Sequence, residues 1–147
     1  MCDTDPMSTF TVLAGGPVSD PEVLALYESV GWGAYTREPQ VLSAAVRGSS
    51  FVVTARNAGG ALVGMARASS DDATVCYLQD ILVHPEFQKS GAGRGLLEAV
   101  QTRYQHVRQF VLITDNESGQ RAFYEALGFT EGSDFRPEPV RVFAQFR

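Results

Sequence analysis

The stretch that decides the fold runs from Tyr77 to Leu97 and reads YLQDILVHPEFQKSGAGRGLL. A mostly apolar run ends at His84-Pro85, where proline stops further ladder pairing and biases the preceding residue toward extended geometry. Glycines follow, and the next apolar residues recur at the spacing of one helix stripe: Leu96, Val100, Tyr104 and Val107. Strand, glycine-rich loop and helix in this order indicate an anion site, because amides at a helix N-terminus converge on negative charge. A phosphate or pyrophosphate is the ligand that fits such a cradle.

Three known phosphate cradles differ in the spacing of their glycines. A P-loop needs glycine, four residues and then Gly-Lys-Ser/Thr, and the sequence contains no such run. A dinucleotide-binding fingerprint needs glycine three positions after its second glycine, and this chain has Leu96 at that distance from Gly93. What remains is the pattern Gln88-x-x-Gly91-x-Gly93, directly after the strand that ends in Val83-His84-Pro85.

The segments on either side of this stretch show clear periodicities and turn signals. They predict strands over Phe10–Leu13, Phe51–Arg56, Ala61–Arg67, Phe110–Thr114 and Val140–Phe146, with a strand from near Thr74 into the central stretch. They predict helices from Ser19–Glu22 to Gly31, from about Glu38 to Val46, and from Asp115–Ser118 to Gly128. Phe51–Arg67 reads as a hairpin, and the wholly apolar Phe110–Thr114 reads as a strand buried on both faces. The pattern is that of a mixed α/β sheet with helices on both faces.

A second pattern lies further along the chain. Asn116 precedes a helix that carries Phe123-Tyr124 and ends in Gly128-Phe129. Together with Gln88-x-x-Gly91-x-Gly93, it resembles the GNAT superfamily of acyl-CoA-dependent N-acyltransferases over residues 51–129. Ala66-Arg67-Ala68 and Asp80 are similar to bacterial relatives of the plant serotonin-type arylalkylamine N-acetyltransferases. The resemblance implies the GNAT fold, a central mixed sheet of six to seven strands with helices on both faces.

Length and composition limit the class of protein. At 147 residues we expect one domain, residues 1–147, able to bury about 68–70% of the surface that its unfolded chain exposes. No apolar run approaches the roughly 20 residues that span a membrane, and Met1–Pro6 lacks a signal peptide's order, so we expect a cytoplasmic protein. A net charge of −5 argues against nucleic-acid binding. The chain's two cysteines and two histidines lack metal-ligand spacing, so we expect no metal.

The resemblance implies acetyl-CoA as the acyl donor and coenzyme A as a product. Residues 88–94, called the phosphate loop below, would bind the pyrophosphate through backbone amides, with charge from Lys89 and Arg94; a solvated helix start is the alternative for these two cations. Backbone groups of Leu82 and Val83 would pair with the pantetheine arm as an added strand. The family usually has glycine where Ser90 lies and a bulky aliphatic residue near Ala92. The implied cofactor-binding residues are Leu82, Val83, Gln88, Lys89, Ser90, Gly91, Ala92, Gly93, Arg94, Asn116 and Tyr124.

Acetyl transfer from a thioester to an amine needs a neutral nitrogen and a proton for the departing thiolate. The resemblance implies Tyr124 as the acid. It lies one residue off the expected apolar stripe of its helix (Ala122, Phe123, Ala126 and Leu127), although a tyrosine at the core boundary is the alternative. Asn116 would face the pantetheine arm, and it could also serve as a helix N-cap.

Asp80 is the candidate general base, because an unpaired carboxylate inside an apolar strand is costly. Strict alternation puts Asp80 on the strand face opposite Tyr77 and Gln79. The alternative is therefore a structural acid paired with an arginine such as Arg67, and a strand bulge would favour the base.

Five residues form the predicted acceptor cluster: Tyr27, Trp32, Tyr35, Tyr77 and Gln79. The resemblance places the first three on the wall made by the first two helices, and the last two at acceptor-side positions of the central strand. Aromatic rings there would suit an aromatic or aliphatic amine, with core packing as the alternative. We therefore expect a primary amine of a small molecule to attack acetyl-CoA directly in a ternary complex, in a protein able to form a homodimer. Protein or peptide acetylation and a non-catalytic acyl-CoA-binding sensor remain the alternatives.

Overall fold

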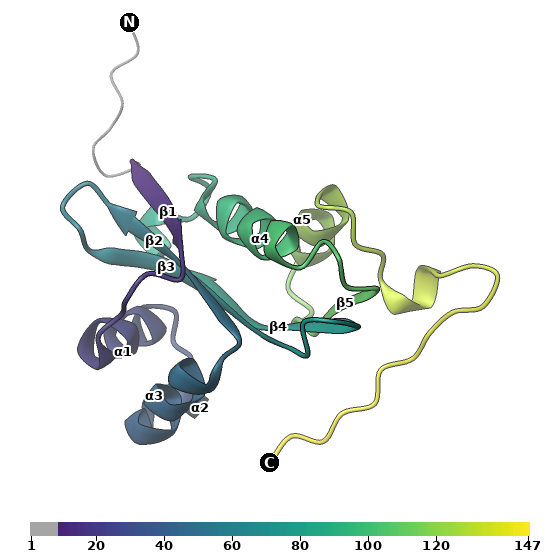
Figure 1. The fold of residues 1–147 in the computed structure, drawn as a ribbon, viewed down its shortest axis with the longest axis horizontal. Helices are drawn as coiled ribbons and strands as arrows, with labels where there is room; N and C mark the ends of the chain where they lie inside the picture. Colours follow the sequence, from purple (N-terminus) through teal and green to yellow (C-terminus); the bar gives the residue numbers. More distant parts are fainter. Residues whose placement is uncertain (1–8) are drawn as a thin grey trace, which may run out of the picture. The chain divides into compact units, whose positions relative to one another are not determined.

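The computed structural model describes residues 9–147 of the chain (Figure 1). These residues fall into two compact units, the first ending at Ile113 and the second covering Thr114–Arg147. Within the described residues, no helix is both long and apolar enough to cross a membrane. The single domain expected from the length of the chain stays a prediction.

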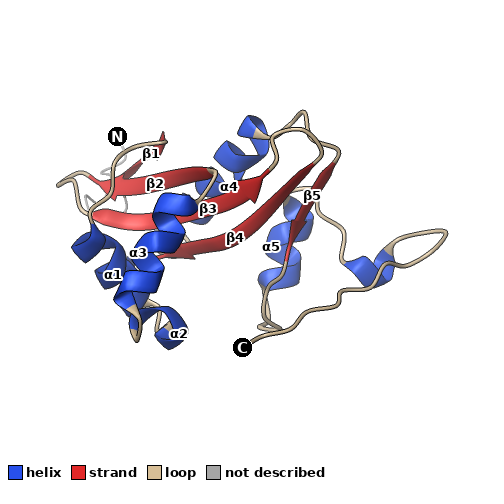
Figure 2. Ribbon diagram, turned by 60° about the horizontal axis from the view of Figure 1, so that its bottom comes forward, coloured by secondary structure: helices blue, strands red, loops and turns tan. Residues whose placement is uncertain are grey.

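The first unit is built on a five-stranded sheet in the order β1-β2-β3-β4-β5 (Figure 2). β1 to β4 are antiparallel neighbours, and β5 runs parallel to β4. The mixed strand directions and the β2–β3 hairpin are therefore confirmed, whereas the expected count of six to seven strands is wrong. The strands are β1 (Phe10–Ala14), β2 (Phe51–Asn57), β3 (Leu62–Ser70), β4 (Val75–Val83) and β5 (Gln109–Leu112).

Helices cover both faces of this sheet, as expected (Figure 1). On one face, Met65 of β3 joins a buried cluster with side chains from α1 (Asp20–Ser29) and α3 (Pro39–Gly48). On the other face lies α4 (Ala92–Arg103), whose Leu96 is fully buried. Gly64 permits this contact, because a Cβ on Gly64 would lie 3.1 Å from the Leu96 side chain. The alternation of β3 side chains thus gives each face its own layer of helices.

The start of α1 follows the sequence prediction closely. Ser19 is the N-cap, and it forms a capping box with Glu22, whose carboxylate accepts the Ser19 amide at 2.7 Å. The same carboxylate accepts both terminal nitrogens of Arg56 at 2.8 and 2.9 Å, which joins α1 to β2. The Arg56 hydrogen bonds, more than any other contact, lower the pKa of Glu22 from its usual 4.5 to about 2.

We expect this depressed pKa to appear as pH-dependent stability. Because the folded state holds Glu22 ionised, its contribution is fully present above pH 4.5 and is lost as the pH falls toward 2. Glu22→Gln should therefore lower the free energy of unfolding by about 1–2 kcal/mol at pH 6 and by much less near pH 2. Urea denaturation at several pH values measures the difference. Glu28→Gln, an exposed change in the same helix, is the control, and parallel wild-type and Glu22→Gln profiles would contradict the assignment.

Two segments of the first unit differ from the sequence prediction. The predicted loop after α1 contains one extra helical turn, α2 (Gly33–Thr36). β5 ends at Leu112 rather than Thr114, its apolar residues are only half-buried, and Ile113 is 42% exposed. A strand buried on both faces was therefore a wrong prediction. Because β5 is the last strand of the sheet, its apolar composition does not bring the two-sided cover that a central strand has.

The second unit contains α5 (Gln120–Ala126) and a short 3-10 turn, η3 (Gly132–Asp134). No strand forms over residues 140–146, and Phe143 and Phe146 are 88% and 85% exposed. The alternating pattern there predicts a strand, but a strand also requires a neighbour for its backbone groups, and within residues 9–147 this segment pairs with none. The prediction of a final strand is therefore wrong.

Candidate active site

The phosphate loop joins β4 to α4 through a short 3-10 turn, η2 (Pro85–Phe87). Gly91 has a φ of 93° and is the N-cap of α4, and Lys89 also lies in the left-handed region, at 66°. Ser90, where the family usually has glycine, ties the loop to itself, since its hydroxyl donates to the Phe87 carbonyl and accepts the Ala92 amide at 3.3 Å. The loop is thus held in one shape by its own side chain and by a backbone that glycine favours at position 91.

The first turn of α4 offers amide donors at the loop. A helix leaves its first four amides without intrahelical acceptors, and Gly91 supplies no side-chain cap. Gly93 and Arg94 lie in this first turn, and within residues 9–147 a Cβ on Gly91 would meet only the Phe10 ring, at 4.0 Å. Ala92 is fully buried and its amide donates to Ser90, so the donors left in this turn are those of Gly93 and Arg94. Amides without acceptors at a helix N-terminus fit a phosphate or diphosphate.

The two cations of the loop remain available for such an anion. Lys89 is exposed. Arg94 lies 3.6 Å from Glu98 one turn along the helix, and both side chains are more than half exposed. An exposed ion pair of this kind is worth at most about 1 kcal/mol, so it does not commit Arg94 to Glu98. Gln88 instead donates to the Val83 carbonyl at 3.3 Å, across the base of the loop.

The second half of β4 has a partner strand on only one side. β5 pairs with Val75–Leu78 and stops there, whereas β3 pairs with β4 along its whole length. Leu82 and Val83 therefore have β3 on one side and, within residues 9–147, no strand on the other. An extended chain with amide groups fits such an edge as an added strand, which is what the resemblance implied for pantetheine.

A buried ion pair lies on the α1 side of β3 and β4. Arg67 and Asp80 are partners in the β3–β4 register, and the Arg67 Nε atom donates to Asp80 Oδ2 at 2.7 Å. Tyr27 donates to the same oxygen at 2.9 Å, and Tyr35 donates to Oδ1 at 3.0 Å. Removing one member of a buried pair costs about 3–5 kcal/mol, because it leaves the other charge unpaired. Although burial opposes the charge of Arg67, the Asp80 carboxylate holds the pKa of Arg67 above its usual value.

A bulge in β4 changes which side chains share a face. The register shifts between Arg67, opposite Asp80, and Ala68, opposite Leu78, so Gln79 is the extra residue. The side chains of Gln79 and Asp80 both reach the Tyr35 hydroxyl as a result. The bulge removes the geometric objection to Asp80 as a base, but three donors occupy its carboxylate. The contacts therefore favour the alternative, a structural acid paired with Arg67.

The structure brings four members of the acceptor cluster together. The rings of Tyr27, Trp32 and Tyr35 lie with centroids 5.2 to 6.3 Å apart, and Gln79 donates to the Tyr35 hydroxyl at 3.2 Å. Tyr27 is fully buried, which favours core packing for this residue. Trp32 and Tyr35 are half-buried, and Gln79 is exposed. Tyr77 is not one of the four: it lies on β4 two residues before Gln79, opposite Ser69 of β3, and is half-buried.

Tyr124 and Asn116 belong to the second unit. Tyr124 is the one buried residue of α5, packed between Phe123 and Phe129 at ring distances of 5.0 and 5.9 Å, whereas Ala122 and Ala126 are exposed. The expected stripe was therefore wrong, and packing also accounts for Tyr124. Burial raises the pKa of Tyr124, so the phenol keeps its proton at neutral pH.

Asn116 does not open the helix that follows it. α5 begins at Gln120, and its N-cap is Gly119, with a φ of 97°. Asp115 instead accepts the Glu117 amide at 3.0 Å in the preceding turn. The N-cap role is therefore wrong for Asn116, and its side chain, which is exposed, is left for the predicted contact with the cofactor.

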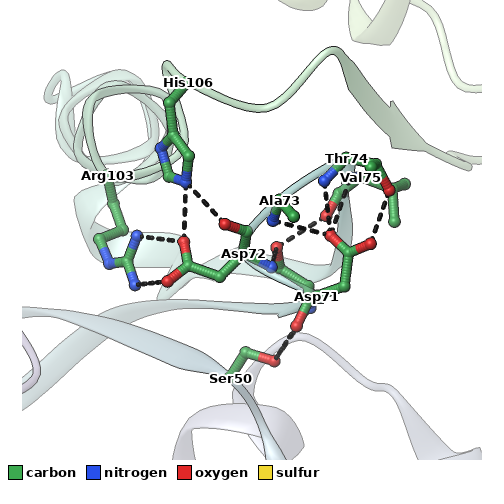
Figure 3. A network of polar contacts seen from close by, with 9 residues as sticks. Ser50, Asp71, Asp72, Ala73, Thr74, Val75, Arg103 and His106 are labelled. Carbon is green, nitrogen blue, oxygen red and sulfur yellow. Dashed lines mark hydrogen bonds and ion pairs between the residues drawn. The ribbon is translucent and has the colours of Figure 1, made fainter.

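A polar clamp that the sequence did not reveal holds the far end of α4 (Figure 3). Asp72, in the β3–β4 turn, accepts both terminal nitrogens of Arg103 at 2.9 and 3.1 Å, and His106 Nε2 lies 2.8 Å from the same carboxylate. Asp71 shapes that turn by accepting the amides of Ala73, Thr74 and Val75. The sequence showed only a polar turn here, because pairing across 31 residues leaves no local signal.

Comparison with known proteins places this geometry in a family. Residues 47–131 match the family model described as an acetyltransferase (GNAT) domain. The soybean (Glycine max) protein named histone acetyltransferase TAP1 is 33% identical over 129 residues, which cover 79% of this chain and 54% of that protein. The chain spans between about half and two thirds of the length of the curated relatives that it matches first.

Solved structures share the fold. A GNAT-family acetyltransferase from Streptococcus pneumoniae TIGR4 superposes with a TM-score of 0.77 at 25% identity, covering 94% of this chain and all of that one. The aminoglycoside N-acetyltransferase AAC(6')-Iy, in complex with CoA, superposes with a TM-score of 0.68 at 19% identity, covering 95% of each chain. The match of more than half of the chain to the family model, with a sheet and helices arranged as in these structures, shows that the chain belongs to the GNAT family of acetyltransferases.

Proposed function

We propose that this chain is an acetyl-CoA-dependent N-acetyltransferase that acts on a primary amine of a small molecule. The observation that carries the proposal is the open first turn of α4, which follows, through η2 and the phosphate loop, the half of β4 that has a partner strand on one side only. A diphosphate suits the first feature and an amide-bearing arm suits the second, and coenzyme A contains both. The aminoglycoside N-acetyltransferase structure in complex with CoA, which shares the fold, supports the choice of donor.

Different residues of this chain would bind the diphosphate and the pantetheine arm of acetyl-CoA. The amides of Gly93 and Arg94 would hold the diphosphate, and the exposed side chains of Lys89 and Arg94 would supply positive charge. Leu82 and Val83 would offer backbone groups to the pantetheine arm. Glycine fits position 91 because the backbone there has a φ of 93°, which L side chains rarely adopt.

The chemistry requires a neutral amine nitrogen that attacks the thioester carbonyl, with a proton returned to the departing sulfur. An alkylamine with a pKa near 10.4 must lose a proton, which costs roughly 4–5 kcal/mol at pH 7. Tyr124 is the proposed acid, supported by its place in the pattern that resembles the family and by a phenol that is protonated at neutral pH. Asp80 as base stays a prediction from the sequence, and its three donors favour a water as the proton acceptor instead.

The half-buried rings of Trp32 and Tyr35, with Gln79 beside them, support an acceptor that has an aromatic or aliphatic body. A protein or peptide amine is the second candidate, supported by the name of the soybean relative. The homodimer and the cytoplasmic location stay predictions from the sequence.

A turnover assay tests the proposal. Free thiol released from acetyl-CoA is followed with a panel of arylalkylamines, aliphatic amines, aminoglycosides and peptides with free N-termini or lysines. Turnover with small amines above the rate of spontaneous hydrolysis supports the proposal. Turnover with peptides alone would shift the acceptor to proteins, and binding of acetyl-CoA without any turnover would support the sensor.

A further inference from the structure

The α2 turn is short, and the rings that pack it on the core cluster, Trp32 and Tyr35, are only half-buried. It consists of four residues, none of them buried, and its N-cap Trp32 makes no side-chain hydrogen bond to it. The chain enters it through Gly31, which has a φ of 75° and open space around it. A single turn of helix is not stable by itself, since helix nucleation is unfavourable. Something outside α2 must therefore fix its position.

Two contacts of Tyr35 supply that attachment: its ring packs against Tyr27 and the core cluster, and its hydroxyl adds directed hydrogen bonds. The hydroxyl donates to Asp80 Oδ1 at 3.0 Å and accepts from Arg67 Nη2 and Gln79 Nε2, each at 3.2 Å. A phenol has one proton to donate and lone pairs to accept with, so three partners fill its capacity. The partners come from both β3 and β4, and the Arg67 guanidinium also lies 5.7 Å from the centre of the Tyr35 ring.

Tyr27 provides the contrast. It donates to the same carboxylate at 2.9 Å, but it belongs to the ten-residue helix α1 and is fully buried. α1 is held by apolar side chains such as Val23 and Leu26 in the core cluster, so it does not depend on one hydroxyl. Tyr35 is half-buried, and its hydroxyl accepts a hydrogen bond from Gln79, whose side chain is exposed.

We propose that Tyr35 is a positioning residue: its hydroxyl fastens α2 to the Arg67–Asp80 pair and to Gln79, and this attachment sets how the acceptor amine is bound. The second clause rests on the proposed acetyltransferase function, whereas the first does not. Because Arg67 and Asp80 neutralise one another, this surface presents Gln79 and aromatic rings rather than a free charge. The protein should then select acceptors by their shape more than by their positive charge, and this selection should require α2 to be held in its position.

Hydrogen exchange tests the attachment without any substrate. In α2, the amides of Thr36, Arg37 and Glu38 donate to the carbonyls of Trp32, Gly33 and Tyr35. Tyr35→Phe should make these amides exchange roughly tenfold faster while the amides of β3 and β4 keep their rates. Tyr27→Phe, which removes one hydrogen bond to the same carboxylate, should lower the melting temperature without selective exchange in α2. Unchanged exchange in Tyr35→Phe, or an equal rise throughout the chain, would overturn the proposal.

Kinetics tests the consequence for the acceptor. With an amine accepted by the wild-type protein, Tyr35→Phe should raise the acceptor KM by about tenfold or more and leave the acetyl-CoA dissociation constant unchanged. Equal acceptor KM values would overturn the role in acceptor binding. If no amine is turned over by the wild-type protein, the proposed function fails, and the exchange comparison still decides whether Tyr35 fastens α2.

Discussion

Gly91→Glu is expected to weaken acetyl-CoA binding by at least about 100-fold, a loss of about 2.7 kcal/mol. Gly91 has a φ of 93° at the N-cap of α4, so a side chain there is strained, and a glutamate also brings negative charge to the place where the diphosphate would lie. Titration calorimetry with acetyl-CoA measures the change. A thermal melt of the same sample shows whether the fold survives.

Gly91→Ala separates the two causes. It carries the backbone strain, about 1–2 kcal/mol, without the charge. We expect Gly91→Ala to bind acetyl-CoA with an affinity between those of the wild type and Gly91→Glu. Added salt should reduce the difference in acetyl-CoA affinity between the two variants, because salt screens the charge of the glutamate. Wild-type affinity in a folded Gly91→Glu protein would remove the phosphate loop from the binding site.

Tyr124→Phe is expected to lower kcat about 100-fold while acetyl-CoA affinity stays within about twofold of the wild type. The phenol is buried and protonated at neutral pH, so it holds a proton that it can deliver to a departing thiolate. Phenylalanine keeps the ring between Phe123 and Phe129 and removes only the hydroxyl. Steady-state kinetics on the best amine, with calorimetry for the donor, gives both values.

Tyr104→Phe is the matched control for Tyr124→Phe. Tyr104 is another buried tyrosine, at the C-cap of α4, and no catalytic role is assigned to it. Its substitution should leave turnover within about twofold of the wild type. An unchanged kcat in Tyr124→Phe would take the tyrosine out of the mechanism, and equal losses in both variants would point to packing.

The first unit was largely predictable from the sequence because its signals are local. Three features can each be recognised from a few neighbouring residues: the Ser19 cap with Glu22, the β2–β3 hairpin and the glycines at the start of α4. The phosphate loop, which the family resemblance implied from the spacing of Gln88, Gly91 and Gly93, leads into a helix start whose N-cap residue has no side chain. The Arg67–Asp80 pair was available only as an alternative, because it depends on two strands coming into register.

The wrong predictions share a physical cause: each of these features depends on neighbouring residues that are distant in the sequence. The bulge at Gln79 is a property of the β3–β4 pairing and carries no mark in β4 itself. The apolar residues of β5 did not reveal that it is an edge strand, and the alternation over residues 140–146 did not supply a partner strand. Ala122 and Ala126 matched a helical stripe, yet Tyr124 is the residue that α5 buries.

The most direct measurement is calorimetric titration of the folded, purified chain with acetyl-CoA and, separately, with S-acetylpantetheine, which lacks the diphosphate. If the phosphate loop binds the diphosphate, acetyl-CoA should bind saturably with a dissociation constant in the micromolar to millimolar range. S-acetylpantetheine should then bind about 100-fold more weakly, or more weakly still. No binding of acetyl-CoA, or equal binding of the two compounds, would contradict this role of the phosphate loop.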